Sequence, residues 1–148
     1  MKTVGKLEWF NGDEEALAMY QMFVDLAHTW DDLVDKDKEV SEQAINHAFA
    51  ICLIYLPMNR FYQAIQYAVL PMWVSVVSAY QTANHYEKTK DEHGIEIAHG
   101  LRYAIGNIIA YAIHVCVGPE KAAELMPEVW KHIMIERYDE YRKEHLNA

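Results

Sequence analysis

The sequence has few of the residues that interrupt or cross-link a fold. It contains only 6 glycines and 4 prolines, with no internal repeat and no segment of low complexity. Apolar residues recur at intervals of 3 or 4 along the chain, and no stretch alternates as a half-buried strand does. The 2 cysteines lie within apolar runs, so we expect buried structural thiols rather than a disulfide framework. The pattern predicts an all-α fold.

The sequence also lacks an excess of positive charge. Its formal net charge is −9 and its pI is about 5.3, so its surface should repel a phosphate backbone, and we expect no nucleic-acid partner. The N-terminus has no apolar signal segment, which predicts a cytoplasmic protein. The least polar stretch, 61–80, is interrupted by glutamine, serine and proline, so we interpret it as a buried helix and not as a membrane span.

Size and composition favour one folded domain. The chain has 148 residues, of which 52% are hydrophobic, enough to form a core and too apolar for a disordered chain. We predict a single all-helical domain over 1–148, a bundle of five to seven helices.

Capping residues set the expected boundaries in the first part of the chain. Asn11 followed by Glu14 resembles a capping box, so a first helix is expected over 12–35. Its apolar side carries a stripe that should face the core, formed by Met19, Phe23, Leu26, Trp30 and Leu33. The acidic segment 35–39 should be a loop, and a second helix should start at Ser41 and stop at Pro57.

Glycine and proline set the expected boundaries further on. Asn59 should start a third helix, which Pro71 should kink or split. The break near Gly94 is ambiguous, because this residue can end one helix or lie in the first turn of the next. The following helix should run to the Gly-Pro pair at 118–119, which opens a short helix, and Pro127 should open the last one.

Long parts of these helices have almost no charge. Between Gln43 and Tyr86 the only formally charged residue is Arg60, and between Ile97 and Pro119 it is Arg102. A small domain has little room to bury several such helices on all sides. We therefore expect them to line a cavity, an oligomer interface or both, and we predict a homodimer.

The first expected helix carries an acidic cluster. At 100° per residue, its members fall within about a third of the helix circumference; they are Asp25, His28, Asp31, Asp32 and Asp35. In a cleft such carboxylates need a cation or another partner, and carboxylate oxygens suit Mg²⁺. On a solvated face the same cluster has no such meaning, and the sequence leaves both interpretations open.

A second polar group lies on the helix before Gly118. It is rich in histidine, tyrosine and asparagine and poor in the lysine typical of a solvated face; its members are Glu96, His99, Tyr103, Asn107 and His114. The preceding helix carries a similar stripe of Ser75, Ser78, Thr82 and His85. Such side chains suit a polar cavity or a hydrogen-bonded contact between helices.

The segment Asp31-Asp32-Leu-Val-Asp35 resembles the Asp-Asp-x-x-Asp motif of class I isoprenoid (terpenoid) synthases. In that family the motif lies on a helix and holds Mg²⁺ ions that bind a substrate diphosphate. The segment from Asn84 to Glu92 is similar to the family's second metal motif at its outer positions, with His85 where aspartate is usual and Lys88 where serine or threonine is usual.

The resemblance implies an isoprenoid-synthase-like fold and a Mg²⁺-dependent site for a diphosphate-containing small molecule. Its metal ligands would be Asp31, Asp32, Asp35, Asn84 and Glu92. Residues that would contact the ligand are His28, Lys88, His99, Arg102, Tyr103 and Asn107. The wider segment from His28 to Asp37, with Leu56 to Tyr62, is also similar to short phage and prophage proteins of no known activity.

Two alternatives belong to other classes. The pair Glu96 and His99 is spaced like a ligand pair of ferritin-like di-iron proteins, but such a site needs a carboxylate from each of four helices, and 43–86 supplies none. The other alternative is a non-catalytic helical protein, of phage or prophage type, that assembles with itself or a partner. Its 10 tyrosines, 4 tryptophans and 7 methionines suit an interface as well as a cavity.

Overall fold

The structure, a computed structural model, describes residues 5–36 and 38–146. All regular secondary structure in these ranges is helical, which confirms the all-α prediction. The chain divides into two compact units, Met1–Gln66 and Tyr67–Ala148, which we call the N-terminal and C-terminal units. The single domain and the synthase-like topology stay predictions, and Asp37 of the expected acidic loop lies outside the described residues.

The N-terminal unit begins with a 3₁₀ turn, η1 (Leu7–Phe10), followed by α1 (Glu14–Asp35). Asp13 caps α1, because its Oδ1 atom accepts a hydrogen bond from the Ala16 N–H at 3.0 Å. The expected cap at Asn11 is therefore wrong. Asn11 instead ends η1 with a positive φ of 53°, and the chain needs two more residues to turn into α1.

After α1 the chain forms α2 (Glu42–Ala50), the π-helical turn η2 (Ile51–Tyr55) and the short α3 (Leu56–Met58). Ser41 caps α2 as predicted, since its Oγ atom accepts from the Ala44 N–H at 3.0 Å. The expected stop at Pro57 is wrong. The Leu56 N–H donates to the Ile51 carbonyl in a wider turn, and the helix continues through Pro57 to Met58 in α3.

Asn59 connects α3 to the long helix α4 (Arg60–Thr89) and confirms the predicted start. Its Oδ1 atom accepts from the Tyr62 N–H, and its Nδ2 atom donates to the Glu15 carbonyl, both at 2.8 Å. The helix continues through Pro71, so it is not split there, and the predicted kink stays a prediction. Pro71 is exposed, and water can bond the carbonyl that its missing N–H leaves without a donor.

Aromatic residues of η1 pack against the first turns of α1. The Tyr20 ring lies 5.9 Å from that of Trp9 and 6.0 Å from that of Phe10, and all three side chains are buried. Further along α1, Trp30 and Leu33 are exposed. The predicted apolar stripe therefore faces the core only in its first half.

The C-terminal unit contains most of α4 together with α5 (Glu92–Leu101), α6 (Gly106–Val117), α7 (Pro119–Ile133) and α8 (Tyr138–Leu146). Its buried centre includes Ala83, Ile95, Ala98 and Tyr141, from α4, α5 and α8. Asp91 caps α5 by accepting from the Gly94 N–H at 3.0 Å. Gly94 thus lies in the first turn of α5, which resolves the ambiguity left by the sequence.

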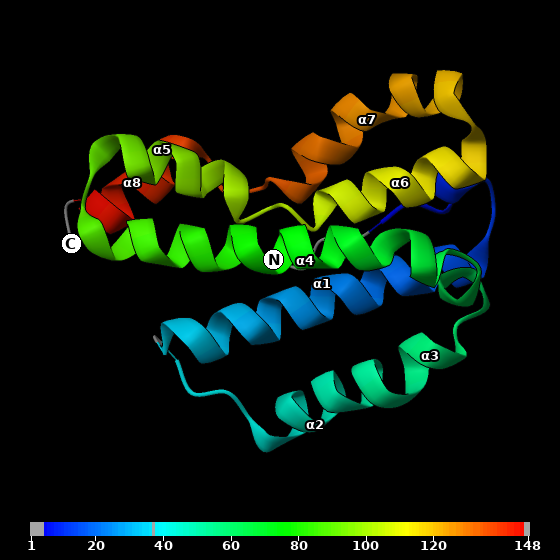
Figure 1. Ribbon diagram of the computed structural model, residues 1–148, viewed down its shortest axis with the longest axis horizontal. Coiled ribbons are helices and arrows are strands. Elements are labelled where there is room, and N and C mark those ends of the chain that lie inside the picture. The colour runs from blue at the N-terminus through cyan, green and yellow to red at the C-terminus, as the bar shows by residue number, and fades with distance from the viewer. Residues whose placement is uncertain (1–4, 37, 147–148) are drawn as a thin grey trace. The chain divides into compact units, whose positions relative to one another are not determined.

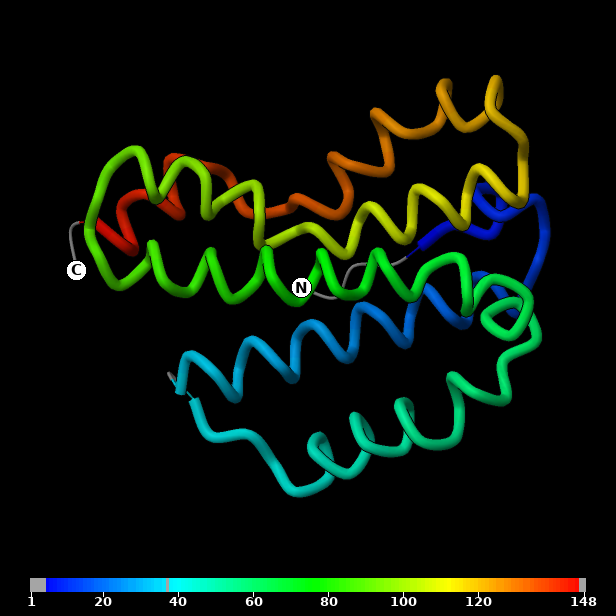
Figure 2. Tube along the Cα trace, in the orientation of Figure 1, coloured from blue at the N-terminus to red at the C-terminus, as the bar shows by residue number. Residues whose placement is uncertain are grey.

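The predicted single helix up to Val117 is wrong, because the chain turns at 102–105 between α5 and α6 (Figure 2). Tight bonds cross the turn, such as that from the Gly106 N–H to the Tyr103 carbonyl at 2.9 Å. Of the described residues, one segment, Glu92–Val117, is long and apolar enough to span a membrane by composition. The turn interrupts that segment, so the observation is weak evidence for a span.

α6 and α7 run side by side (Figure 1). A methyl group on Gly106 would meet the Trp130 ring, so the glycine allows this close approach. The expectation that Pro127 opens the last helix is wrong. Pro127 lies inside α7 and is exposed, so the bond it cannot make is replaceable by water, as at Pro71.

The apolar runs are less buried than expected. Cys52 is exposed and Cys116 is half-buried, so the prediction of two buried thiols is wrong. Cys52 lies in η2 next to Leu53 and Ile54, which are exposed as well. The stretch 61–80, expected to be a buried helix, also has a buried and an exposed side.

Candidate functional site

The acidic cluster of the N-terminal unit lies on the last three turns of α1. Asp31 and Asp32 are half-buried, whereas His28 and Asp35 are exposed. One Asp32 oxygen pairs with Lys38 Nζ at 3.3 Å. Within the described residues, no group of three or more His, Cys, Asp or Glu side chains is placed to hold a metal ion. The motif is helical, as the resemblance implies, and its carboxylates come from one helix face.

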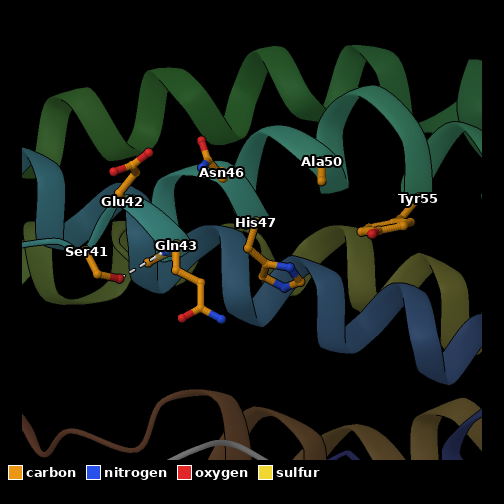
Figure 3. Close-up of a pocket in the computed structure, with 8 residues that line it drawn as sticks. Ser41, Glu42, Gln43, Asn46, His47, Ala50 and Tyr55 are labelled. Carbon is orange, nitrogen blue, oxygen red and sulfur yellow. Dashed lines mark hydrogen bonds between the residues drawn. The ribbon is translucent and has the colours of Figure 1, made fainter.

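Asp25 of the same cluster faces α2. Its Oδ2 atom lies 3.3 Å from His47 Nε2, and this pair joins the two helices. His47 also lines an open cleft of about 850 Å³ along α2 (Figure 3). The lining residues are Ser41, Glu42, Gln43, Ala44, Asn46, His47, Ala50 and Tyr55. None of the residues predicted from the synthase resemblance lines this cleft.

The second predicted ligand set lies in the C-terminal unit. Asn84 is half-buried near the end of α4, and Lys88 is exposed one turn later. Glu92, in the first turn of α5, forms an ion pair with Arg142 of α8. Their hydrogen bond also raises the pKa of the Arg142 guanidinium. Glu92 therefore has a protein cation as its partner.

Two of the predicted ligand contacts belong to one polar network. Arg102 Nε lies 3.5 Å from a Glu87 oxygen, and Arg102 Nη1 lies 3.9 Å from a Glu136 oxygen. His99 Nε2 lies 2.9 Å from the Glu136 backbone carbonyl, and its ring packs at 5.9 Å against Tyr103. These contacts join the end of α4, the turn after α5 and the segment between α7 and α8.

Asn107 lies apart from this network in the described structure. It is the second residue of α6 and its side chain is exposed. The expected stripe of His99, Tyr103 and Asn107 does not form, because the turn at 102–105 rotates α6 relative to α5.

The network has a central residue that was not among the residues predicted from the sequence. Tyr141 of α8 is fully buried, and its hydroxyl donates to a Glu87 oxygen at 2.8 Å. The Arg102 guanidinium carbon lies 5.3 Å from the centre of the Tyr141 ring. Burial raises the pKa of the Tyr141 phenol, and the hydrogen bond and charge of Glu87 raise it further. The phenol is thus held in its neutral, donating form.

Glu136 lies at the edge of the network, where opposing effects act on the pKa of its carboxyl group. Burial raises the pKa of its carboxyl, the neighbouring Glu144 carboxylate raises it again, and Arg102 opposes both effects. The Arg102 side chain is only 16% exposed and Glu87 only 8%. The charge of this largely buried guanidinium is therefore balanced by two carboxylates of the protein, and its plane lies near an aromatic ring.

This arrangement can hold three helices in register, and its charged groups are already paired. Two signals could have found it. One is Glu87, the first charged residue after the uncharged stretch 61–86 of α4. The other is the spacing of Tyr138, Tyr141 and His145, which places three polar rings on one face of α8. A comparison with known protein families, curated proteins and solved structures finds no match to this chain.

Proposed function

We propose that this protein is a non-catalytic helical protein that acts by assembling with further copies of itself. The observation that carries the proposal is the amount of large hydrophobic side chain exposed on the helices of both units. Single exposed apolar residues are ordinary on a protein surface, whereas contiguous ones mark interaction sites.

The N-terminal unit exposes such a surface over α2, η2 and α3. Leu53 is 72% exposed, Met58 is 70% exposed, and Phe49 and Ile54 are exposed beside them. No formally charged residue lies between Gln43 and Asn59. A solvated helix face usually carries lysine and glutamate, so this composition favours contact with another apolar surface.

The polar groups of the C-terminal unit support the same proposal. Arg102 and Glu92, which a diphosphate or metal site would need, are engaged with Glu87, Glu136 and Arg142. A ligand at Arg102 would have to break its largely buried contact with Glu87 before binding, and separating such a pair is unfavourable. The network therefore serves better as a structural support than as a binding site.

The proposal is tested by the dependence of mass and stability on protein concentration. Sedimentation velocity from about 1 μM to 1 mM should show a rise in mass, and the melting temperature should rise with concentration, because association stabilises only the folded chain. A monomer over the whole range, with an invariant melting temperature, contradicts the proposal.

One observation favours a second candidate, a Mg²⁺-dependent site for a diphosphate. Asp31 and Asp35 lie one turn apart on α1, the helical setting that the resemblance to isoprenoid synthases implies. Their oxygen donors are of the type that Mg²⁺ prefers. Under this candidate, Mg²⁺ with pyrophosphate raises the melting temperature of the protein.

A matched pair of variants tests this second candidate. Asp31→Asn should abolish the rise in melting temperature, whereas Asp139→Asn, which removes an exposed carboxylate from α8, should leave it unchanged. Equal responses of both variants, or no response of the natural chain, would remove the candidate without affecting the assembly proposal.

A further inference from the structure

The exposed side of α4 carries a regular row of side chains, which we call the α4 stripe. It consists of Gln63, Tyr67, Leu70, Val74, Val77 and Gln81, all exposed. Tyr67 is 82% exposed and Val74 is 70% exposed. The successive spacings of 4, 3, 4, 3 and 4 place the six residues within about 80° of the helix circumference at 100° per residue.

The stripe is separate from the side of α4 that packs inside the protein. The buried residues of that side include Ile65, Val69, Val76, Tyr80 and Ala83. At 100° per residue their direction lies about 140° from that of the stripe. The helix therefore has two apolar sides, and only the buried side packs in the core of the protein.

No charge interrupts the stripe. From Phe61 to Tyr86 the sequence has no Asp, Glu, Lys or Arg, although the chain has a formal net charge of −9. Two copies of so acidic a protein repel each other unless they meet through an uncharged surface. The stripe is such a surface, about 27 Å long at 1.5 Å per residue.

We infer that the α4 stripe is a dimer interface, in which α4 packs antiparallel against α4 of a second copy, with the two-fold axis at the level of residue 72 along the helix. The inference rests on the proposed assembly function and names its interface and partner. An apolar row with alternating spacings of 3 and 4 is the pattern by which two helices pack along a shared seam.

The order of residues in the stripe supports a second copy as the occupant. Leu70 and Val74 lie two residues on either side of Met72, Tyr67 and Val77 lie five, and the two glutamines lie nine. An antiparallel two-fold pairing therefore places Leu70 against Val74 at the centre and Tyr67 against Val77 next to them. The amides of Gln63 and Gln81 meet at the ends. A two-fold interface must be self-complementary in this way.

The antiparallel direction follows from charge. A parallel pairing sets Arg60, at the start of α4, beside its own copy and aligns the two helix dipoles. An antiparallel pairing separates the two arginines by nearly the length of the helix and opposes the dipoles. Leu70 of one copy then faces Val74 of the other across helix axes about 8 to 10 Å apart.

The first experiment measures dimer dissociation by sedimentation equilibrium for the natural chain and three variants. Val74→Asp should raise the dissociation constant at least about 100-fold, because each dimer would then bury two unpaired carboxylates. Val115→Asp is the matched control, since Val115 is an exposed valine on α6, and it should leave the constant unchanged. Leu53→Asp tests the α2–η2–α3 surface in the same way. Circular dichroism and the melting temperature of each variant verify its folding.

The second experiment tests the register with two single-cysteine chains in which Cys52 and Cys116 are replaced by serine. One carries Leu70→Cys and the other Val74→Cys. With oxidised glutathione as the oxidant, a mixture should form the 70–74 heterodisulfide faster than either chain forms its own homodisulfide, because like positions are offset by about 6 Å along the axis. Dominant homodisulfides would establish a parallel pair and overturn the antiparallel register.

The outcomes separate this inference from the proposed function. A dimer that survives Val74→Asp and is lost in Leu53→Asp overturns the α4 interface and leaves the assembly proposal intact. A chain that stays monomeric at all concentrations overturns both. Loss of the dimer in Val74→Asp alone, with the heterodisulfide as the main product, supports both.

Discussion

Two buried tyrosines offer a direct test of the polar network around Arg102. Both Tyr141 and Tyr20 have fully buried side chains. The Tyr141 hydroxyl donates to Glu87 at 2.8 Å, whereas the Tyr20 hydroxyl has no hydrogen-bond partner among the described residues. Replacing either by phenylalanine removes one oxygen and preserves the ring, so the two variants differ mainly in the hydrogen bond that is lost.

The expected cost differs between the two sites. A hydrogen bond to a charged group contributes about 1.5 to 3 kcal/mol. Glu87 keeps Arg102 at 3.5 Å in the variant, so we expect Tyr141→Phe to lower the free energy of unfolding by about 2 kcal/mol. For a domain of this size that is a fall of about 4 to 8 °C in melting temperature. Tyr20→Phe should be neutral or stabilising, because a buried hydroxyl without a partner is unfavourable.

Urea unfolding at pH 7, followed by circular dichroism and by tryptophan fluorescence, measures both free energies. The two probes should give coincident transitions before a two-state analysis is applied. The reasoning about the network fails if Tyr141→Phe costs no more than Tyr20→Phe. Such a result would mean that the Glu87 carboxylate is satisfied by Arg102 and solvent alone.

Three further predictions concern packing, capping and pH. In urea unfolding, Gly106→Ala should lower the free energy of unfolding by about 1 to 3 kcal/mol, because the added methyl group meets Trp130. Gly100 has open space around it, so Gly100→Ala should raise the free energy of unfolding by up to about 1 kcal/mol. Asn59→Ala should cost about 2 kcal/mol in the same assay, since it loses a helix cap and a hydrogen bond to the partly buried Glu15 carbonyl. The pKa of Glu136 is raised in the folded protein. Its contribution to stability is therefore fully present below its pKa in the unfolded chain, about 4.3, and is lost as the pH rises through its pKa in the folded protein. Glu136→Gln should therefore flatten the fall in melting temperature over that pH range.

Two helix starts were predicted from local caps, whereas the cap of α1 was assigned to Asn11 instead of Asp13. Ser41 and Asn59 cap the helices that the sequence assigned to them, because each side chain bonds a backbone N–H three residues later. Proline stops were not predictable. Pro71 and Pro127 lie inside helices at exposed positions, where the loss of one backbone bond costs little and the apolar face on the other side of the helix keeps its packing.

Only part of the polar network could be predicted from the sequence. His99 and Arg102 are unusual in an otherwise uncharged segment, and sequence reasoning marked both as candidates for binding a ligand. Their partners Glu136 and Tyr141 come from more than thirty residues later, and no local periodicity connects them. A pairing between distant helices depends on the turn at 102–105, which the apolar pattern around it gave no reason to expect.

The uncharged helix α4 shows what an apolar pattern specifies and what it leaves open. Burial of Val69 inside the chain and burial of Val74 against a second copy would give the same free energy for each area removed from water, so both positions are occupied by the same residue type. Hydrophobicity alone therefore cannot tell a core from an interface. The additional information lies in symmetry, because a two-fold interface must pair compatible side chains at equal distances on either side of one position. In the α4 stripe the equally spaced pairs around position 72 are Leu70 with Val74, Tyr67 with Val77 and Gln63 with Gln81.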